Sequence, residues 1–192
     1  WLAGFRIKYF LYSFFAIICL SPIGITLLKP YQKSRILTFL NPERDPLGGG
    51  YQIIQSKIAV GSGGIFGKGY LQGSQSYLDY LPEKHTDFIF TLFSEEFGFI
   101  GSLLLLIIYI FIISRIISIG NQSKNNFARL YCFGFATAFF TYVAVNMSMV
   151  LGLLPIVGAP LPIMSYGGSS MLAIMLGLSI VMSCKVYQQD AP

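Results

Sequence analysis

Charged side chains are scarce in this sequence. Only 11% of the residues are Asp, Glu, Lys or Arg, whereas 54% are hydrophobic. The run from Leu130 to Cys184 contains no charged side chain at all. A mean hydropathy of +0.65 lies outside the range of ordinary soluble domains. This composition excludes a soluble globular protein and predicts an integral membrane protein.

Cysteine and histidine are also rare. The three cysteines, Cys19, Cys132 and Cys184, lie inside apolar runs without the spacing of metal ligands, so we interpret them as packing residues. The chain opens with Trp1 and carries no cleavable signal pattern. We therefore expect it to be a piece of a longer protein.

Four apolar stretches approach the roughly 20 residues that a helix needs to cross a bilayer. We predict one all-α membrane domain over residues 1–192, with about four transmembrane helices at 9–28, 97–114, 130–154 and 163–184. The segment "PIVGAPLP" at 155–162 carries three prolines and divides the last long run into two spans. A long loop at 29–96 and a shorter one at 115–129 complete the predicted organisation.

The basic residues of the short connections predict the orientation. With four spans, six of them lie on one side, which the positive-inside rule makes cytoplasmic: Arg6, Lys8, Arg115, Lys124, Arg129 and Lys185. The loop at 29–96 and the turn at 155–162 would then be extracytoplasmic. The net charge of +5 thus reflects topology and not nucleic-acid binding.

The predicted outer loop is long enough to carry a function. "SRILTFL" at 34–40 predicts a short interfacial helix capped by Ser34. "YQIIQSKIAVGS" at 51–62 predicts a second amphipathic or re-entrant helix, with Tyr51, Ile54 and Ile58 on its apolar face.

The glycine-rich stretch "GSGGIFGKG" at 61–69 only superficially resembles a nucleotide-binding loop. Ser62 and Gly69 occupy positions where a Walker A motif requires Gly and Ser or Thr, so we reject an ATP site. Either the stretch forms a tight turn, or its amides and Lys68 contact an anionic substrate. The pair Glu43 and Asp45 has prolines beside it and no evident third metal ligand, which favours a capping or turn role.

The segment "LPEKHTDFIF" at 81–90 places Asp87 at the head of an apolar run. The carboxylate could merely stabilise a helix N-terminus, an effect of about 0.3–1 kcal/mol. Alternatively, partial desolvation would raise its pKa and suit it to proton abstraction. Glu95 and Glu96 interrupt the same run, and ionisable groups at membrane depth usually face a cavity. His85 could assist there or be a structural histidine.

Three segments, "NPERDPLGGGYQIIQSKIAVGSGGIFGKG", "YLPEKHTDFIFTLFSEEFGFIG" and "LLPIVGAPLPIMSYGGSS", closely resemble the SEDS family of bacterial cell-wall polymerases, particularly its RodA branch. The resemblance covers essentially the whole chain. It implies that these residues correspond to the last four helices of a ten-helix fold. It also implies an inverting peptidoglycan glycosyltransferase that polymerises lipid II and releases undecaprenyl pyrophosphate.

The resemblance places the family's essential aspartate on Asp87, which would act as the general base on the acceptor sugar hydroxyl. Departure of pyrophosphate requires positive charge, from a divalent cation or from basic side chains. "SYGGSS" at 165–170 either permits close helix packing or lines the family's central cavity. The full predicted substrate-binding set comprises Arg44, Lys57, Lys68, Glu83, Lys84, His85, Glu95 and Ser165.

The expected partner is a class B penicillin-binding protein, a transpeptidase, and the expected location is the bacterial cytoplasmic membrane with the site facing outward. Two other functions stay open. A flippase for lipid-linked precursors would also need a polar cavity between helices, and a non-catalytic scaffold of the elongation complex would need only a surface.

Overall fold

The structure, a computed structural model, describes residues 8–9, 11–12, 14–16, 19, 29–42, 48–73 and 85–189. Its regular elements are helices, with no strand among these residues, which confirms the all-α prediction. Three helices are long and apolar enough to cross a membrane: α5 (Ile89–Gln122), α6 (Asn126–Val150) and α7 (Gly168–Gln189). Most of the predicted span at 9–28 lies outside the described residues.

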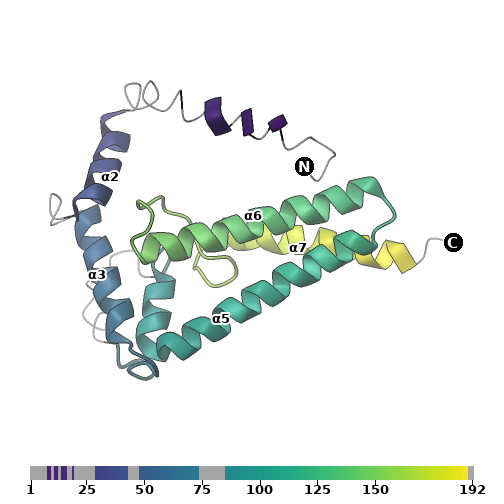
Figure 1. Ribbon diagram of the computed structural model, residues 1–192. Coiled ribbons are helices and arrows are strands. Elements are labelled where there is room, and N and C mark those ends of the chain that lie inside the picture. The colour runs from purple at the N-terminus through teal and green to yellow at the C-terminus, as the bar shows by residue number, and fades with distance from the viewer. Residues whose placement is uncertain are drawn as a thin grey trace.

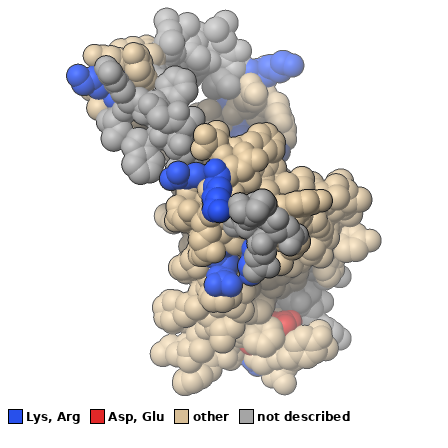
Figure 2. Space-filling view, turned by 90° about the vertical axis from the view of Figure 1, so that its right-hand side faces the viewer, with Lys and Arg blue, Asp and Glu red and all other residues tan. Residues whose placement is uncertain are grey.

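The three long helices lie side by side, and each runs antiparallel to its neighbour in sequence (Figure 1). A turn of three residues, Ser123–Asn125, joins α5 to α6, and the Asn125 side chain caps α6 by accepting the Phe127 N–H at 3.0 Å. The C-terminal ends of α5 and α7 therefore meet the N-terminal end of α6. Figure 2 views this end of the molecule and shows basic side chains on its surface. The sequence supplies it with Arg115, Lys124, Arg129 and Lys185.

The helix ends differ from the prediction. α5 continues past Arg115 to Gln122, because a long basic side chain is compatible with a helix, so the predicted loop at 115–129 shrinks to three residues. α6 ends at Val150 and α7 begins at Gly168. The predicted turn at 155–162 is thus the middle of a longer irregular segment, residues 151–167, that crosses from α6 to α7.

Two shorter helices precede the bundle. α2 (Pro30–Leu40) begins with proline at its first position, where the missing N–H costs nothing. The predicted cap, Ser34, is wrong. This residue lies inside α2, and its hydroxyl donates to the Tyr31 carbonyl at 2.8 Å.

α3 (Gly49–Ser62) confirms the second predicted helix, although the predicted apolar face is wrong. Ile54 and Ile58 are exposed, while the buried face consists of Gly50, Ile53, Ser56 and Ala59. The small residues on this face let α3 approach α5 and α6 closely. The Ser56 hydroxyl, for example, donates to the Val150 carbonyl at 2.9 Å.

The main core joins α5, the C-terminal half of α6 and the irregular segment. Its buried members are Phe88, Phe90, Tyr109, Phe139, Val143, Met147, Met149, Val150 and Leu161. The buried Tyr109 hydroxyl donates to the Pro162 carbonyl at 2.7 Å, which fixes the irregular segment to α5.

Candidate active site

The candidate site is a turn, His85–Phe88, that leads directly into α5. Phe88 is only 1% exposed and anchors the turn in the main core. Thr86 and Asp87 are half-buried, and His85 is exposed. The turn thus holds a carboxylate at the edge of the core, where a ligand can reach it.

Three consecutive backbone carbonyls of this turn accept hydrogen bonds from distant parts of the chain. The Tyr166 N–H donates to the His85 carbonyl at 2.9 Å, and the Ser165 hydroxyl donates to the Thr86 carbonyl at 2.6 Å. The Asn146 amide donates to the Asp87 carbonyl at 2.8 Å. The backbone that carries the carboxylate is therefore held at three successive positions.

The two side-chain donors are themselves buried, and each makes two hydrogen bonds. Asn146 is fully buried in α6, and its amide also donates to the Ala159 carbonyl at 2.7 Å. Ser165 is 7% exposed, and its hydroxyl also accepts the Leu161 N–H at 2.7 Å. Each side chain thus ties the turn to the irregular segment between α6 and α7.

The irregular segment also approaches the carboxylate itself. A Cβ atom added at Gly158 would lie 3.2 Å from Oδ2 of Asp87. Gly158 has φ +75°, a conformation that side chains other than glycine rarely adopt. The glycine therefore lets the backbone pass beside the Asp87 carboxylate without crowding it.

A second polar cluster lies about two helical turns farther along α5. Glu95 is completely buried, and its Oε1 atom lies 2.7 Å from Nζ of Lys68, whose side chain is 29% exposed. The Ser62 hydroxyl lies 3.5 Å from the same oxygen. A charge buried to this degree is stable only with such partners.

This cluster sits where α5 is broken. Gly98 has φ +66° and ψ −160°, so α5 consists of a short helix before it and a long helix after it (Figure 1). Residues 99–122 extend about 36 Å at 1.5 Å per residue. The long part alone is enough to cross the roughly 30 Å bilayer core.

The glycine-rich loop supplies the hydrogen bonds that the break removes. The N–H groups of Lys68 and Gly69 donate to the carbonyls of Glu95 and Glu96, both at 3.0 Å. In the opposite direction, the Phe99 and Ile100 N–H groups donate to the carbonyls of residues 64 and 65, at 2.9 and 3.1 Å. Of the two interpretations of this stretch, the structural turn is the one with described contacts.

The described members of the predicted site thus lie in three places. Asp87, His85 and Ser165 come together, and Lys68 and Glu95 pair with each other at the break. Lys57 is exposed on α3, and its Cε atom lies where a side chain on Gly152 would begin. The remaining three, Arg44, Glu83 and Lys84, lie outside the described residues.

The sequence does not reveal Gly158 as a contributor, because its positive φ is a signal only once the fold is known. Asn146, a polar residue within a predicted span, is open in sequence to two interpretations, a hydrogen bond between helices or a place in the cavity lining. Neither interpretation names its partners at the Asp87 turn.

Within the described ranges, no three His, Cys, Asp or Glu side chains lie close enough together to hold a metal ion. Mg²⁺ commonly binds through one or two carboxylates together with substrate phosphates and water. A single carboxylate such as Asp87 could take part in this kind of site, which the substrate completes. It could not form a site made of protein ligands alone.

Residues 1–190 match the family model of the FtsW, RodA and SpoVE cell cycle proteins. The chain belongs to this family. It is 50% identical over 163 residues to the Escherichia coli K12 peptidoglycan glycosyltransferase MrdB, covering 85% of this chain and 44% of that protein. It is 44% identical to the Treponema pallidum peptidoglycan glycosyltransferase RodA, covering 88% of this chain and 39% of that one.

Two solved structures share the fold. One is a chain from a study of how a peptidoglycan synthase complex coordinates polymerization and crosslinking, with a TM-score of 0.70, 38% identity and coverage of 95% of this chain and 49% of that chain. The other is a point mutant of Thermus thermophilus rod shape determining protein RodA, with a TM-score of 0.51, 26% identity and coverage of 86% and 61%. The chain spans about half the length of the curated relatives it matches.

Proposed function

We propose that this chain is part of a peptidoglycan glycosyltransferase of the RodA branch, which polymerises lipid II into glycan strands during cell elongation. The observation that carries the proposal is Asp87, a half-buried carboxylate on a backbone held by three successive hydrogen bonds. Relatives named peptidoglycan glycosyltransferase, at 44% and 50% identity, support it.

In this proposal Asp87 is the general base. Its carboxylate takes the proton from an acceptor sugar hydroxyl as that oxygen attacks the anomeric carbon of the donor. The bond from this carbon to the diphosphate oxygen breaks, and undecaprenyl pyrophosphate leaves with the bonding electrons. One displacement inverts the anomeric carbon, so no covalent carboxylate partner is required. A positioned base typically contributes about 10²–10⁴ in rate.

Rigid placement of the carboxylate is what the surrounding structure supplies. A misplacement of about 1 Å can cost about 10²-fold in rate. Asn146 and Ser165 restrict such movement through the Asp87 and Thr86 carbonyls. We regard both as positioning residues.

The proposal extends to orientation, charge and partner. The basic end of the bundle would be cytoplasmic and the Asp87 end extracytoplasmic. A divalent cation would supply counter-charge for the leaving diphosphate. A class B penicillin-binding protein is the proposed partner, supported by the likeness to a chain of a peptidoglycan synthase complex.

The test compares wild type with Asp87→Asn in the full-length protein with its partner, using purified lipid II in detergent. We expect glycan strands from wild type and none from Asp87→Asn, although both fold and bind the partner. Undiminished polymerisation by Asp87→Asn would exclude this base. Movement of lipid II across sealed vesicles without its consumption would instead support the flippase.

A further inference from the structure

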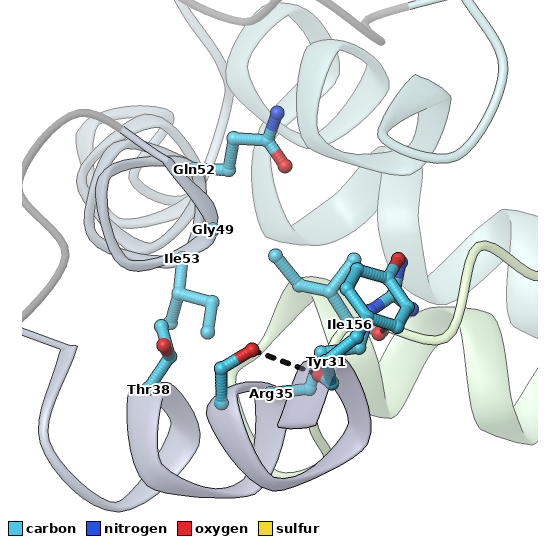
Figure 3. A pocket seen from close by; sticks show the side chains of 8 residues that line it. Tyr31, Arg35, Thr38, Gly49, Gln52, Ile53 and Ile156 are labelled. Carbon is cyan, nitrogen blue, oxygen red and sulfur yellow. Dashed lines mark hydrogen bonds between the residues drawn. The ribbon is translucent and has the colours of Figure 1, made fainter. Parts of the chain in front are cut away.

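A separate cavity lies between α2, α3 and the irregular segment. Its volume is about 250 Å³, whereas one water molecule needs only about 10–15 Å³ of such space. The lining residues are Tyr31, Ser34, Arg35, Thr38, Gly49, Gln52, Ile53 and Ile156 (Figure 3). Tyr31 and Ser34 are exposed, so the cavity can be reached from outside.

The lining combines polar and apolar groups and carries one positive charge. Hydroxyl groups come from Tyr31, Ser34 and Thr38, and an amide comes from Gln52. Arg35 is the cationic member, and no acidic side chain among the described residues forms an ion pair with it. A cavity with one cation, several donors and no acidic wall favours an anion.

Arg35 is held in place before any ligand arrives. Its guanidinium carbon lies 4.7 Å from the centre of the Tyr31 ring, one N–H group donates to the Tyr31 hydroxyl, and another donates to the Ile156 carbonyl at 2.5 Å. A guanidinium carries five N–H donors, so these contacts leave three for a ligand. A planar cation fixed in this way suits the paired oxygens of a phosphate group.

The surroundings indicate that the phosphate is carried by a lipid. α2 exposes Ile36, Leu37 and Leu40 together with Tyr31, a composition typical of a helix at a membrane interface. At that depth the abundant anions are lipid phosphates. Gly49, the first residue of α3, also lines the cavity and adds the positive end of a helix dipole.

We propose that this cavity binds the phosphate group of a membrane lipid, with Arg35 as the principal ligand and Gln52 and the hydroxyl groups of α2 as additional donors. The site is distinct from the Asp87 turn, yet Ile156 at its wall stands two residues before Gly158 on the same segment. Binding requires no turnover, so the inference can fail while the proposed glycosyltransferase activity stands, and the reverse.

The test measures lipid binding to the full-length protein by native mass spectrometry, with phosphatidylglycerol, undecaprenyl monophosphate and neutral diacylglycerol as probes. We expect Arg35→Gln to weaken binding of one or both phosphate lipids about tenfold, the effect of losing a charged hydrogen bond. The binding of neutral diacylglycerol should not change. Arg35→Lys should retain part of the affinity because it keeps the charge.

Two further variants separate binding from a structural role of Arg35. Gln52→Leu changes a donor in the lining but leaves the Arg35 contacts intact, and it should also weaken phosphate-lipid binding. Lys33→Gln removes the same charge from α2 outside the cavity lining and serves as the matched control. A loss for both phosphate lipids identifies a general headgroup site, and a loss for undecaprenyl monophosphate alone identifies a site for the isoprenoid carrier. Equal affinity of wild type, Arg35→Gln and Gln52→Leu for both phosphate lipids would overturn the proposal.

Discussion

The Asp87 carboxylate lies 3.2 Å from the point where a side chain on Gly158 would begin. Two segments more than 70 residues apart in sequence thus meet at the group that we propose as the base. Gly158→Ala would impose a strained φ and crowd the carboxylate, at a cost of about 1–3 kcal/mol. We expect a strong loss of lipid II polymerisation, measured by gel separation of glycan strands. Gly168→Ala is the matched control, because a Cβ atom there would meet no neighbour within 4 Å.

The next prediction concerns the two positioning residues. Asn146→Leu removes both amide donors, and Ser165→Ala removes the hydroxyl that holds Thr86. Asn146→Leu leaves the part-buried carbonyls of Asp87 and Ala159 unpaired, and Ser165→Ala leaves the Thr86 carbonyl and the Leu161 N–H unpaired. We expect turnover to fall about 10–100-fold with a smaller change in KM. Because both residues hold one turn, the double variant should lose less than the product of the two single effects.

The control for this pair is Thr141→Ala. Thr141 is exposed on α6 and donates only to the Thr137 carbonyl of its own helix. It should leave turnover unchanged. If Asn146→Leu also kept full turnover, Asn146 would only tie the turn to the irregular segment, without an effect on catalysis.

The Lys68–Glu95 pair predicts a stability effect. Lys68→Met would leave Glu95 completely buried without its cation and should lower the free energy of unfolding by more than the roughly 1 kcal/mol of an exposed pair. A fully buried pair reaches about 3–5 kcal/mol. Adding Glu95→Gln should restore part of the loss, whereas Lys124→Met, at an exposed lysine, should be nearly neutral. Thermal unfolding of the purified full-length wild type and these three variants measures the effect.

Gly98 predicts that the helix break is obligatory. A Cβ atom there would lie 2.3 Å from the Gly67 backbone nitrogen, and φ is +66°. We expect Gly98→Ala to lower Tm and the yield of folded protein, because either the break or the loop must move. Gly61→Ala, a helical position with no neighbour within 4 Å, should instead be neutral or slightly stabilising. A normal Tm for Gly98→Ala would show that the break is not required.

The proposed orientation predicts opposite accessibility of the two ends. In a full-length background without native cysteines, Lys124→Cys should react with an impermeant maleimide only after the cytoplasmic side is opened. Tyr166→Cys, at a side chain that is 81% exposed, should react in intact spheroplasts. The reverse pattern would place the Asp87 turn in the cytoplasm.

Composition alone predicts much of this fold, because long uncharged runs have few alternatives to membrane-crossing helices. The family was predicted correctly from three segments that include the "HTD" of residues 85–87. The predicted ends of α5 differ from the observed ones because Arg115 and Gly98 are ambiguous in sequence. The helix passes through Arg115 and breaks at Gly98.

The site could be predicted only at its side chains. Asp87, His85 and Ser165 carry recognisable chemistry, and the structure brings them to one turn. The donors that fix this turn bind backbone carbonyls, which every residue possesses. Inspection of the sequence therefore cannot identify which carbonyls accept these hydrogen bonds. The same limitation hid the glycine-rich loop's role at the break.

That loop also has a bearing on biogenesis. Residues 63–69 are synthesised before α5. The loop groups that complete the hydrogen bonding of α5 at its break therefore exist before the break itself has left the ribosome. The two pieces of α5 therefore need not enter the bilayer with bare amides and carbonyls at their junction. The loop residues are instead available to pair with α5 as soon as its first turns have been made.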